Sequence, residues 1–218
     1  MRITSKSALA SLFSFGIGLA CFTGGARAVG TIYSNVDITS FTPVTLGPGG
    51  GIGAEAVDPN AVYSNVTNGG TSALPNGGGT TVGTTTFSDM IVDDLNATHG
   101  GTLTKFSFSI VNFNAGTVAV QSNVRFYDDA AGQPGNLLGG FNFNPINLGA
   151  SSGGVFSLTI PAASQFPIPS KVWAGVFFTG SSVAQVNNFA QILFNPANVG
   201  STADLDFDSG AAGGPFVT

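Results

Sequence analysis

The chain has 218 residues, of which 43% are hydrophobic and only 8% are charged, and its formal net charge is −5. An acidic chain with few Lys and Arg residues repels phosphate backbones, so we expect no nucleic-acid partner. The single Cys lies at position 21, so the rest of the chain has no disulfide and no thiolate chemistry.

The first 28 residues have the three parts of a secretory signal peptide. Arg2 and Lys6 give a positive start, residues 8–22 are uncharged and mostly apolar, and Ala26-Arg27-Ala28 supplies the small residues before a cleavage site. The apolar run is too short and too rich in Gly and Ser for a membrane span of about 20 residues. We therefore predict that residues 1–28 are removed on export.

The mature chain is then residues 29–218. Loss of Arg2, Lys6 and Arg27 takes three positive charges away and moves the net charge from −5 to −8. We expect this chain to be secreted or held at the cell surface, without a membrane span. An alternative is a lipoprotein, in which Cys21 is the lipidated residue.

Short runs of β-branched and Phe residues between Gly, Pro and Asn breaks recur along the mature chain, which indicates an all-β fold. Besides the central stretch described next, the pattern predicts strands at 31–38, 41–46, 61–66, 87–95, 141–148, 155–160, 171–179 and 185–194. We expect the strand at 87–95 to reach the domain edge, and residues 171–178, apolar on both faces, to form an interior strand. The Gly/Thr-rich segment 67–86 is predicted to be a flexible surface loop.

The clearest pattern lies in residues 103–129, where two alternating segments are joined by a short Asn/Gly break at 114–116. A period of two side chains is typical of half-buried strands, so we predict a central hairpin here. Pro134-Gly135, shortly afterwards, favours a type II turn. Together the elements predict a single antiparallel β-sandwich, jelly-roll-like, over residues 29–218.

One face of the second alternating segment is polar and carries a candidate binding site. Its residues are Gln121, Asn123, Arg125, Tyr127 and Asp129. A ring, a charged donor and amide groups together are typical of a sugar-binding face; the alternative is an ordinary solvated outer face. Trp173 is either a stacking platform for a sugar or, since its neighbours are apolar, a core residue.

Asp204, Asp206 and Asp208 form a candidate calcium site, because their i, i+2, i+4 spacing puts three carboxylates on one face of an extended segment. Ca²⁺ prefers such oxygen ligands. The alternative is a solvated strand end that binds nothing, so calcium is the one cofactor that the sequence leaves open.

The sequence shows no catalytic constellation. His99 is the sole histidine and lies in a Gly-flanked loop without a nucleophile-elbow pattern, and no second His or Cys exists to complete a zinc site. Two carboxylates suffice for glycoside hydrolysis. A carbohydrate-active hydrolase or lyase that uses carboxylates of Asp93, Asp94, Asp128 and Asp129 is therefore an alternative to a protein without enzymatic activity.

Four stretches between about residues 102 and 210 read TLTKFSFSI, VRFYDDAAGQPGNLLGG, PSKVWAGVFF and VGSTADLDFDSG. Together they resemble exported bacterial β-sandwich proteins of the exosortase-sorted (PEP-CTERM) type. Such proteins have a leader, a sandwich domain and a C-terminal Pro-Glu-Pro motif with a hydrophobic span. The third part is missing from this sequence, so we expect either a truncated chain or a released protein. The resemblance implies an extracellular, matrix-associated or surface role.

These observations predict a non-catalytic, secreted or surface-associated protein that interacts with extracellular matrix or polysaccharide. The alternatives are the carbohydrate-active enzyme and a calcium-stabilised structural scaffold. The sequence leaves the oligomeric state open.

Overall fold

The computed structural model describes residues 30–44, 59–64, 71–73, 79–193, 197, 199–202, 206–209 and 216–217. Strands dominate this part of the chain, and its α-helix, α1 (Val183–Val186), has four residues. Among the residues described, no helix is long and apolar enough to cross a bilayer. The predicted removed segment, residues 1–28, lies outside the described residues.

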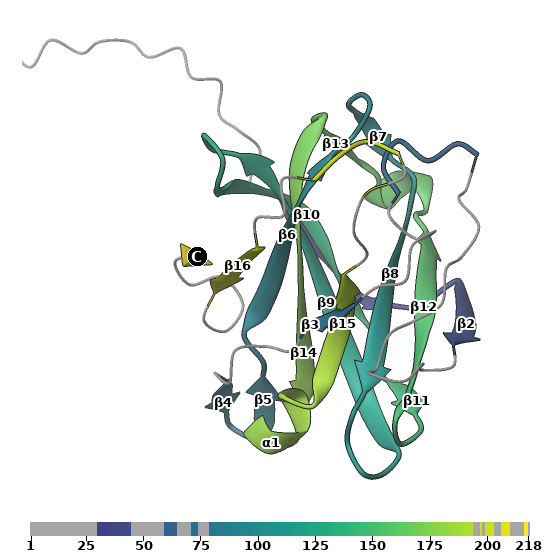
Figure 1. Ribbon diagram of the computed structural model, residues 1–218, viewed down its shortest axis with the longest axis vertical. Helices are drawn as coiled ribbons and strands as arrows, with labels where there is room; N and C mark the ends of the chain where they lie inside the picture. Colours follow the sequence, from purple (N-terminus) through teal and green to yellow (C-terminus); the bar gives the residue numbers. More distant parts are fainter. Residues whose placement is uncertain are drawn as a thin grey trace, which may run out of the picture.

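Most of the described strands belong to two sheets that form the layers of a sandwich (Figure 1). The larger sheet has the order β1 (Thr31–Val36), β10 (Pro134–Phe143), β9 (Val118–Asp129), β14 (Lys171–Gly180), β6 (Met90–Asn96), β16 (Asp206–Ser209) and β17 (Phe216–Val217). The smaller sheet has the order β2 (Ser40–Val44), β12 (Ser152–Thr159), β8 (Lys105–Asn112), β15 (Phe189–Leu193) and β3 (Thr71–Ala73). Almost all pairs are antiparallel, β1 with β10 being parallel. The predicted all-β sandwich is confirmed.

Short strands complete the two layers. β4 (Thr80–Val82), β5 (Thr85–Phe87) and β11 (Ile146–Leu148) extend the larger sheet, and β7 (Gly101–Leu103) pairs with β13 (Phe166–Ile168) at one end of the sandwich. The chain changes sheet between β8 and β9, between β12 and β14, and again between β14 and β15. Repeated passages of this kind are the basis of a jelly-roll-like arrangement.

Phenylalanine rings fill the space between the sheets. The ring centroid of Phe106 (β8) lies 5.3 Å from that of Phe126 (β9) and 5.3 Å from that of Phe141 (β10). At the edge of the smaller sheet, Phe41 of β2 stacks on Phe156 of β12 with ring centroids 4.6 Å apart. Ring pairs of this kind contribute about 0.5–1.5 kcal/mol each beyond their burial. Alternate residues of both sheets therefore build the core, as the period-two pattern predicts.

β8 and β9 do not form the predicted hairpin. β8 pairs with β12 and β15 in the smaller sheet, whereas β9 pairs with β10 and β14 in the larger one. The segment between them is a corner, and the fully buried Asn112 holds it. Its Nδ2 donates to the backbone oxygens of Gly116, Leu148 and Gly149 at 3.1, 3.1 and 2.7 Å, and its Oδ1 accepts from the backbone N–H of Asn114. The hairpin prediction is wrong because alternation tells which side chains face the core, and a corner satisfies it as well as a hairpin does.

Three further predictions about local structure are wrong. The strand at 87–95 does not lie at an edge, since β6 pairs with β14 on one side and β16 on the other. The segment 67–86 is not a loop throughout, because it contains β3, β4 and the start of β5, with Gly83 at φ +64° in the turn between the last two; its flexibility stays a prediction. Pro134-Gly135 begins β10, and the preceding turn is closed by a 2.8 Å bond from Ala130 N–H to the oxygen of Gln133.

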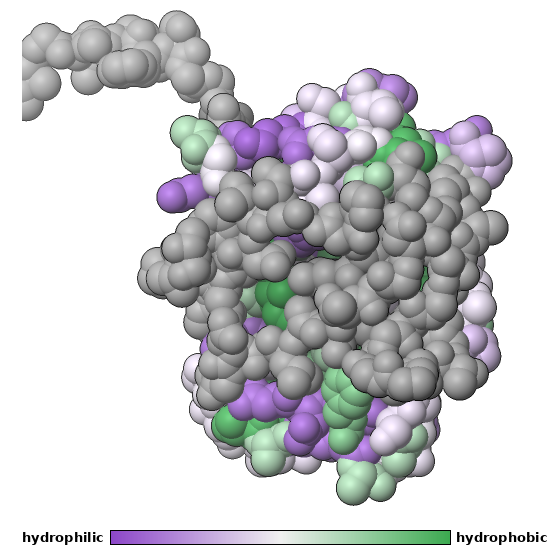
Figure 2. Space-filling model, in the orientation of Figure 1, coloured by the Kyte–Doolittle hydropathy of each residue, from purple (hydrophilic) through white to green (hydrophobic). Residues whose placement is uncertain are grey.

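Figure 2 shows hydrophilic side chains at the end of the visible face near β7 and β13, and hydrophilic and apolar side chains together at the end near α1. The candidate site described next lies at the β13 end.

Candidate functional site

The five residues predicted to bind sugar lie along one face of β9, but that face is largely buried. Asn123, Arg125 and Tyr127 are 4%, 7% and 7% exposed, and Gln121 and Asp129 are partly buried. The alternative of a solvated outer face is therefore wrong for the three central residues. Alternation in a single strand cannot distinguish a face that water covers from one that other segments cover.

The guanidinium group of Arg125 donates its hydrogen bonds within the larger sheet. Nη1 donates to the backbone oxygens of Val124 and Phe141 at 2.9 and 3.3 Å, and Nη2 donates to Oδ1 of Asn142 at 2.7 Å. The guanidinium carbon lies 5.0 Å from the ring centroid of Phe177, a cation–π contact. Burial lowers the pKa of Arg125, and the neighbouring tyrosine on the same face offsets part of that effect.

A second apolar cluster explains why this face is buried. It consists of Met90, Val92, Tyr127, Trp173 and Phe177, on β6, β9 and β14. The hydroxyl of Tyr127 donates to Sδ of Met90 at 3.7 Å, and burial raises the pKa of this tyrosine. Trp173 is 0% exposed, so the interpretation as a core residue is confirmed and a stacking platform is excluded.

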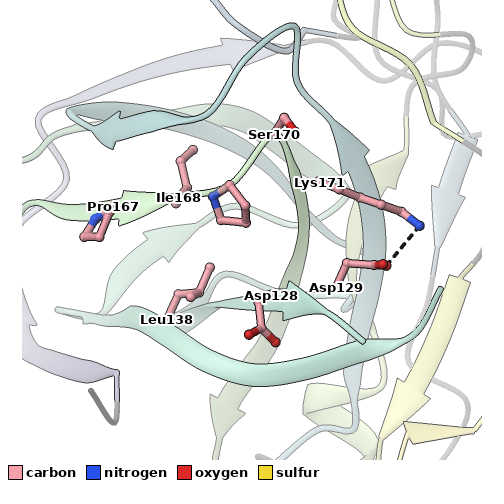
Figure 3. Close-up of a pocket in the computed structure, with 8 residues that line it drawn as sticks. Asp128, Asp129, Leu138, Pro167, Ile168, Ser170 and Lys171 are labelled. Atoms are coloured by element: carbon pink, nitrogen blue, oxygen red, sulfur yellow. Dashed lines mark ion pairs between the residues drawn. The ribbon is translucent and has the colours of Figure 1, made fainter. Parts of the chain in front are cut away.

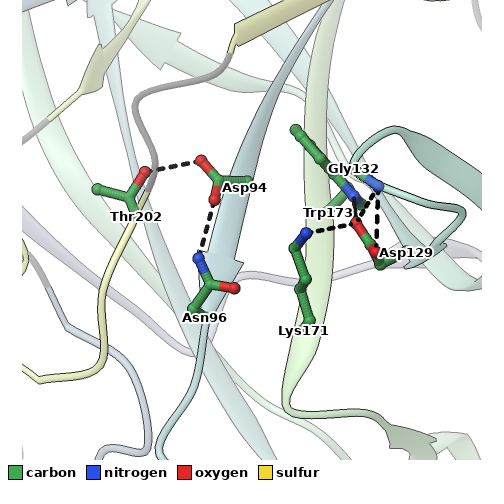
Figure 4. Close-up of polar contacts among 7 residues, drawn as sticks. All are labelled: Asp94, Asn96, Asp129, Gly132, Lys171, Trp173 and Thr202. Atoms are coloured by element: carbon green, nitrogen blue, oxygen red, sulfur yellow. Dashed lines mark hydrogen bonds and ion pairs between the residues drawn. The ribbon is translucent and has the colours of Figure 1, made fainter.

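Asp129, the last residue of β9, is partly buried, and Figure 4 shows its polar contacts. Its Oδ1 lies 3.0 Å from Nζ of Lys171 and accepts from Nε1 of Trp173 at 3.0 Å. Both of its oxygens accept from the backbone N–H of Gly132 at 3.2 Å. Burial alone would raise the pKa of Asp129, but these hydrogen bonds and the charge of Lys171 lower it overall. The carboxylate therefore stays ionised and joins the turn after β9 to the start of β14.

A shallow groove of about 520 Å³ lies beside this ion pair (Figure 3). Its walls come from the end of β9, from β10, from β13 and from the segment that leads into β14; they are Asp128, Asp129, Leu138, Pro167, Ile168, Pro169, Ser170 and Lys171. Two carboxylates, an ammonium and a hydroxyl thus meet an apolar wall. Of the five residues predicted to bind sugar, Asp129 alone belongs to this groove.

Of the four acids considered for catalysis, Asp128 and Asp129 line the groove, whereas Asp93 and Asp94 lie outside it. Asp93 and Asp94 are neighbours in β6, so their side chains point to opposite faces of the sheet. Asp94 is 0% exposed, and it accepts from Nδ2 of Asn96 at 2.9 Å and from Oγ1 of Thr202 at 2.8 Å (Figure 4). Asp94 therefore fixes the end of β6 to the segment before β16.

Asp128 also has a local role. Its Oδ1 accepts from the backbone N–H of Asn136 at 2.6 Å, and its Oδ2 accepts from Nδ2 of the same residue at 3.1 Å. This arrangement closes the connection between β9 and β10 and places the carboxylate at the groove.

The predicted calcium site is only partly within the described residues. Asp204 lies outside them, and so do the side chains of Asp206 and Asp208, whose backbone forms β16. In the register of the sheet Asp206 lies opposite Asp93, which adds a fourth acidic position to the same region. Among the side chains that the structure describes, no group of three His, Cys, Asp or Glu residues could hold a metal ion. Calcium at the three aspartates stays a prediction.

The sequence analysis did not assign the apolar wall and the ammonium of the groove to a site. Pro167 and Pro169 are recognisable in the sequence as a break between strands, and Lys171 begins the apolar strand β14. The sequence alone does not show that this break lies close in space to the end of β9, about 40 residues earlier in the chain. That proximity follows from the pairing of β14 with β9, in which Val172 lies opposite Asp128.

Comparison with known proteins gives no match: no family model, no curated protein sequence and no solved structure is significantly similar to this chain. The resemblance to exosortase-sorted proteins therefore stays a prediction.

Proposed function

We propose that this protein is a non-catalytic protein of the cell exterior that binds polysaccharide, and that the groove beside Asp129 and Lys171 holds part of the sugar chain. The observation that carries the proposal is the meeting of an ion pair, a second carboxylate and an apolar wall in one shallow, open groove. An open groove suits a polymer, which passes through a site rather than being enclosed in it.

Each wall of the groove matches one part of a sugar. Sugar hydroxyls donate hydrogen bonds to carboxylates, and Asp129 has lone pairs on Oδ2 beyond the one that Gly132 uses. The ammonium of Lys171, which is 42% exposed, donates to sugar oxygens. The C–H face of a sugar ring packs against apolar side chains, here Leu138, Pro167 and Ile168.

The electrostatics of the groove support binding rather than hydrolysis. A glycosidase needs a general acid whose pKa is raised towards neutrality. The pKa of Asp129 is shifted in the opposite direction, and the oxygens of Asp128 accept bonds from the turn that they close. The net charge of −5 further favours a neutral polymer over one that carries carboxylates or sulfates.

A co-sedimentation assay tests the proposal. The purified protein is mixed with insoluble cellulose, chitin and xylan, with Ca²⁺ or with EDTA, and the bound fraction is measured. We expect retention on at least one polymer without release of reducing ends. Lys171→Met should weaken retention about tenfold, because a charge-assisted hydrogen bond contributes about 1.5–3 kcal/mol.

Matched variants separate binding at the groove from general effects of charge. Asp128→Asn changes a groove carboxylate, whereas Asp37→Asn changes one that likewise accepts from an Asn, at 2.6 Å from Asn144, outside the groove. We expect weaker retention for Asp128→Asn and wild-type retention for Asp37→Asn. Retention that is lost with EDTA but unaffected by groove variants would assign binding to the aspartates of β16 instead. Absence of retention on every polymer would overturn the proposal.

A further inference from the structure

Trp173 joins the second apolar cluster to the groove through one hydrogen bond. Its ring is 0% exposed and packs in that cluster with Met90, Tyr127 and Phe177. From this position its Nε1 donates to Oδ1 of Asp129, a residue of the groove, at 3.0 Å (Figure 4). Protein interiors are close-packed, so an indole that is buried on all sides has little freedom to turn. Its N–H therefore points at the carboxylate from a fixed place.

Two other donors among the described residues bond to Asp129, and neither combines a fixed position with a preference for one oxygen. Lys171 lies 3.0 Å from Oδ1, but its ammonium ends a flexible stem and its side chain is 42% exposed. The backbone N–H of Gly132 lies 3.2 Å from both oxygens, so it does not favour either of them. Trp173 is thus the rigid donor that is specific for Oδ1.

The bond from Trp173 determines where the second carboxylate oxygen points. The torsion that turns the carboxylate of an Asp is broad and only weakly restricted by the side chain itself. With Oδ1 held, Oδ2 of Asp129 accepts from Gly132 alone among the residues that the structure describes. A carboxylate oxygen has two lone pairs, so Oδ2 keeps capacity to accept from a further donor.

We propose that Trp173 is a positioning residue of the groove, whose indole N–H holds the carboxylate of Asp129 so that Oδ2 stays available to a sugar hydroxyl. Trp173 is fully buried, so it acts through Asp129 and does not contact the sugar. This inference rests on the proposed polysaccharide binding and adds to it a residue outside the groove. It also gives a reason for a Trp in this cluster, because a buried indole N–H needs a partner and the groove carboxylate supplies one.

Retention on the polymer that wild type binds gives the first test. Trp173→Phe keeps an aromatic ring but removes the donor. We expect retention to weaken about fivefold, less than for loss of a direct bond to a charged group, because Lys171 and Gly132 still hold the carboxylate part of the time.

Two further variants separate positioning from a general loss of packing. Phe177→Leu removes part of a ring from the same cluster, opposite Asn123 in the register of β9, and should keep wild-type retention. In the Asp129→Ala background, Trp173→Phe should change retention by less than about twofold, because a residue that acts only through Asp129 has nothing left to position.

The acid titration of Asp129 gives a second readout that does not depend on the polymer. Burial alone would raise the pKa of Asp129, but its bonds, among them that from Trp173, lower it overall. Trp173→Phe should therefore raise this pKa, and Phe177→Leu should leave it at the wild-type value. The NMR signal of the carboxyl carbon over a pH series measures it. Wild type and both variants share the other ionisable groups of this region, which are Asp94, Tyr127, Asp128 and Lys171.

A second replacement keeps the test decisive if Trp173→Phe does not fold. The chain has one Trp, so expression with benzothienylalanine in place of tryptophan changes position 173 alone. This analogue has a ring of nearly the same shape, with sulfur in place of the N–H.

The outcomes distinguish this inference from the proposed function. Wild-type retention without the N–H, an unchanged pKa of Asp129, or an equal loss of retention in the Asp129→Ala background would each overturn the role of Trp173. Retention of wild type would meanwhile keep the polysaccharide proposal in place. Absence of wild-type retention on every polymer would instead overturn the proposed function, and this inference with it.

Discussion

At the scale of single residues, Asp129 makes the stability of the protein depend on pH. Burial alone would raise its pKa, but bonds from Lys171, Trp173 and Gly132 lower it below the ordinary value of 3.8. The folded protein therefore holds this carboxyl ionised more firmly than the unfolded chain does. Its stabilising effect is complete above the unfolded pKa and is lost as the pH falls through the lowered folded pKa.

We expect the thermal midpoint of wild type to fall more steeply than that of Asp129→Asn between about pH 5 and pH 2. Circular dichroism melts in a pH series measure both midpoints. The other carboxyl groups titrate in both proteins, so the comparison isolates Asp129. Parallel curves for the two proteins would contradict the assigned role of this carboxylate.

Two buried serines predict opposite effects of the same substitution. Oγ of Ser122, which is 2% exposed, has no hydrogen-bond partner in the part of the chain that the structure describes. Oγ of Ser88, which is 0% exposed, donates to the oxygen of Asp89 at 2.7 Å and accepts from the N–H of Phe178 at 2.9 Å. A buried polar group without a partner costs about 1–3 kcal/mol, so Ser122→Ala should raise the free energy of unfolding by about 1 kcal/mol.

Ser88→Ala should lower that free energy by a similar amount, because it leaves a backbone N–H without its partner. Urea titrations followed by Trp173 fluorescence measure both variants. Equal changes of the same sign would show that hydrogen bonding does not decide the effect.

At the scale of elements, the corner between β8 and β9 depends on a single side chain. Asn112, the last residue of β8, donates to the backbone oxygen of Gly116 at the far end of the corner and to those of Leu148 and Gly149, at the end of β11 and just after it. Asn112→Ala removes these bonds in a fully buried position, and we expect a loss of about 3 kcal/mol in the free energy of unfolding. Asn147→Ala, on an exposed position of β11, is the control and should change it by less than about 0.5 kcal/mol. A tolerated Asn112→Ala would mean that the corner is held by the packing of its strands alone.

At the scale of the whole molecule, the calcium hypothesis predicts a stability that depends on the ion. A ligand that binds only the native state raises stability, by about 2.7 kcal/mol at a hundred times its Kd. If Asp204, Asp206 and Asp208 hold calcium, the thermal midpoint should rise between EDTA and millimolar Ca²⁺, and the rise should vanish in Asp206→Asn. Thermal melts that coincide in the two buffers would contradict the calcium hypothesis.

Most strands could be predicted from the sequence, because alternation is a local property. β12 and β14 lie close to their predicted positions, and the apolar run in β14 correctly indicates a strand covered on both faces. Which strands pair with each other could not be predicted in this way, since pairing depends on residues far apart in the chain. Two adjacent alternating segments predict a hairpin at 114–116. The side-chain amide of Asn112, which holds the corner found there instead, cannot be recognised from the sequence pattern.

The candidate site was less predictable for a related reason. Arg125 and Tyr127 look like surface residues because polar and ionisable groups usually face water. Here cation–π and sulfur contacts with Phe177 and Met90 accommodate them in a second apolar cluster. The groove combines residues from three separate segments, so its apolar wall could not be assigned before the pairing of β9 with β14 was known.

The pairing of β1 and β2 with distant residues also determines when these two strands can join their sheets during synthesis. β1 pairs with residues 139–143 and β2 with residues 153–157, so each strand leaves the ribosome about a hundred residues before its partner. At a synthesis rate of about 5–20 residues per second, roughly 5–20 s pass between the synthesis of each strand and that of its partner. Until then both strands lack their partners, so the N-terminal edges of the two layers close late in synthesis.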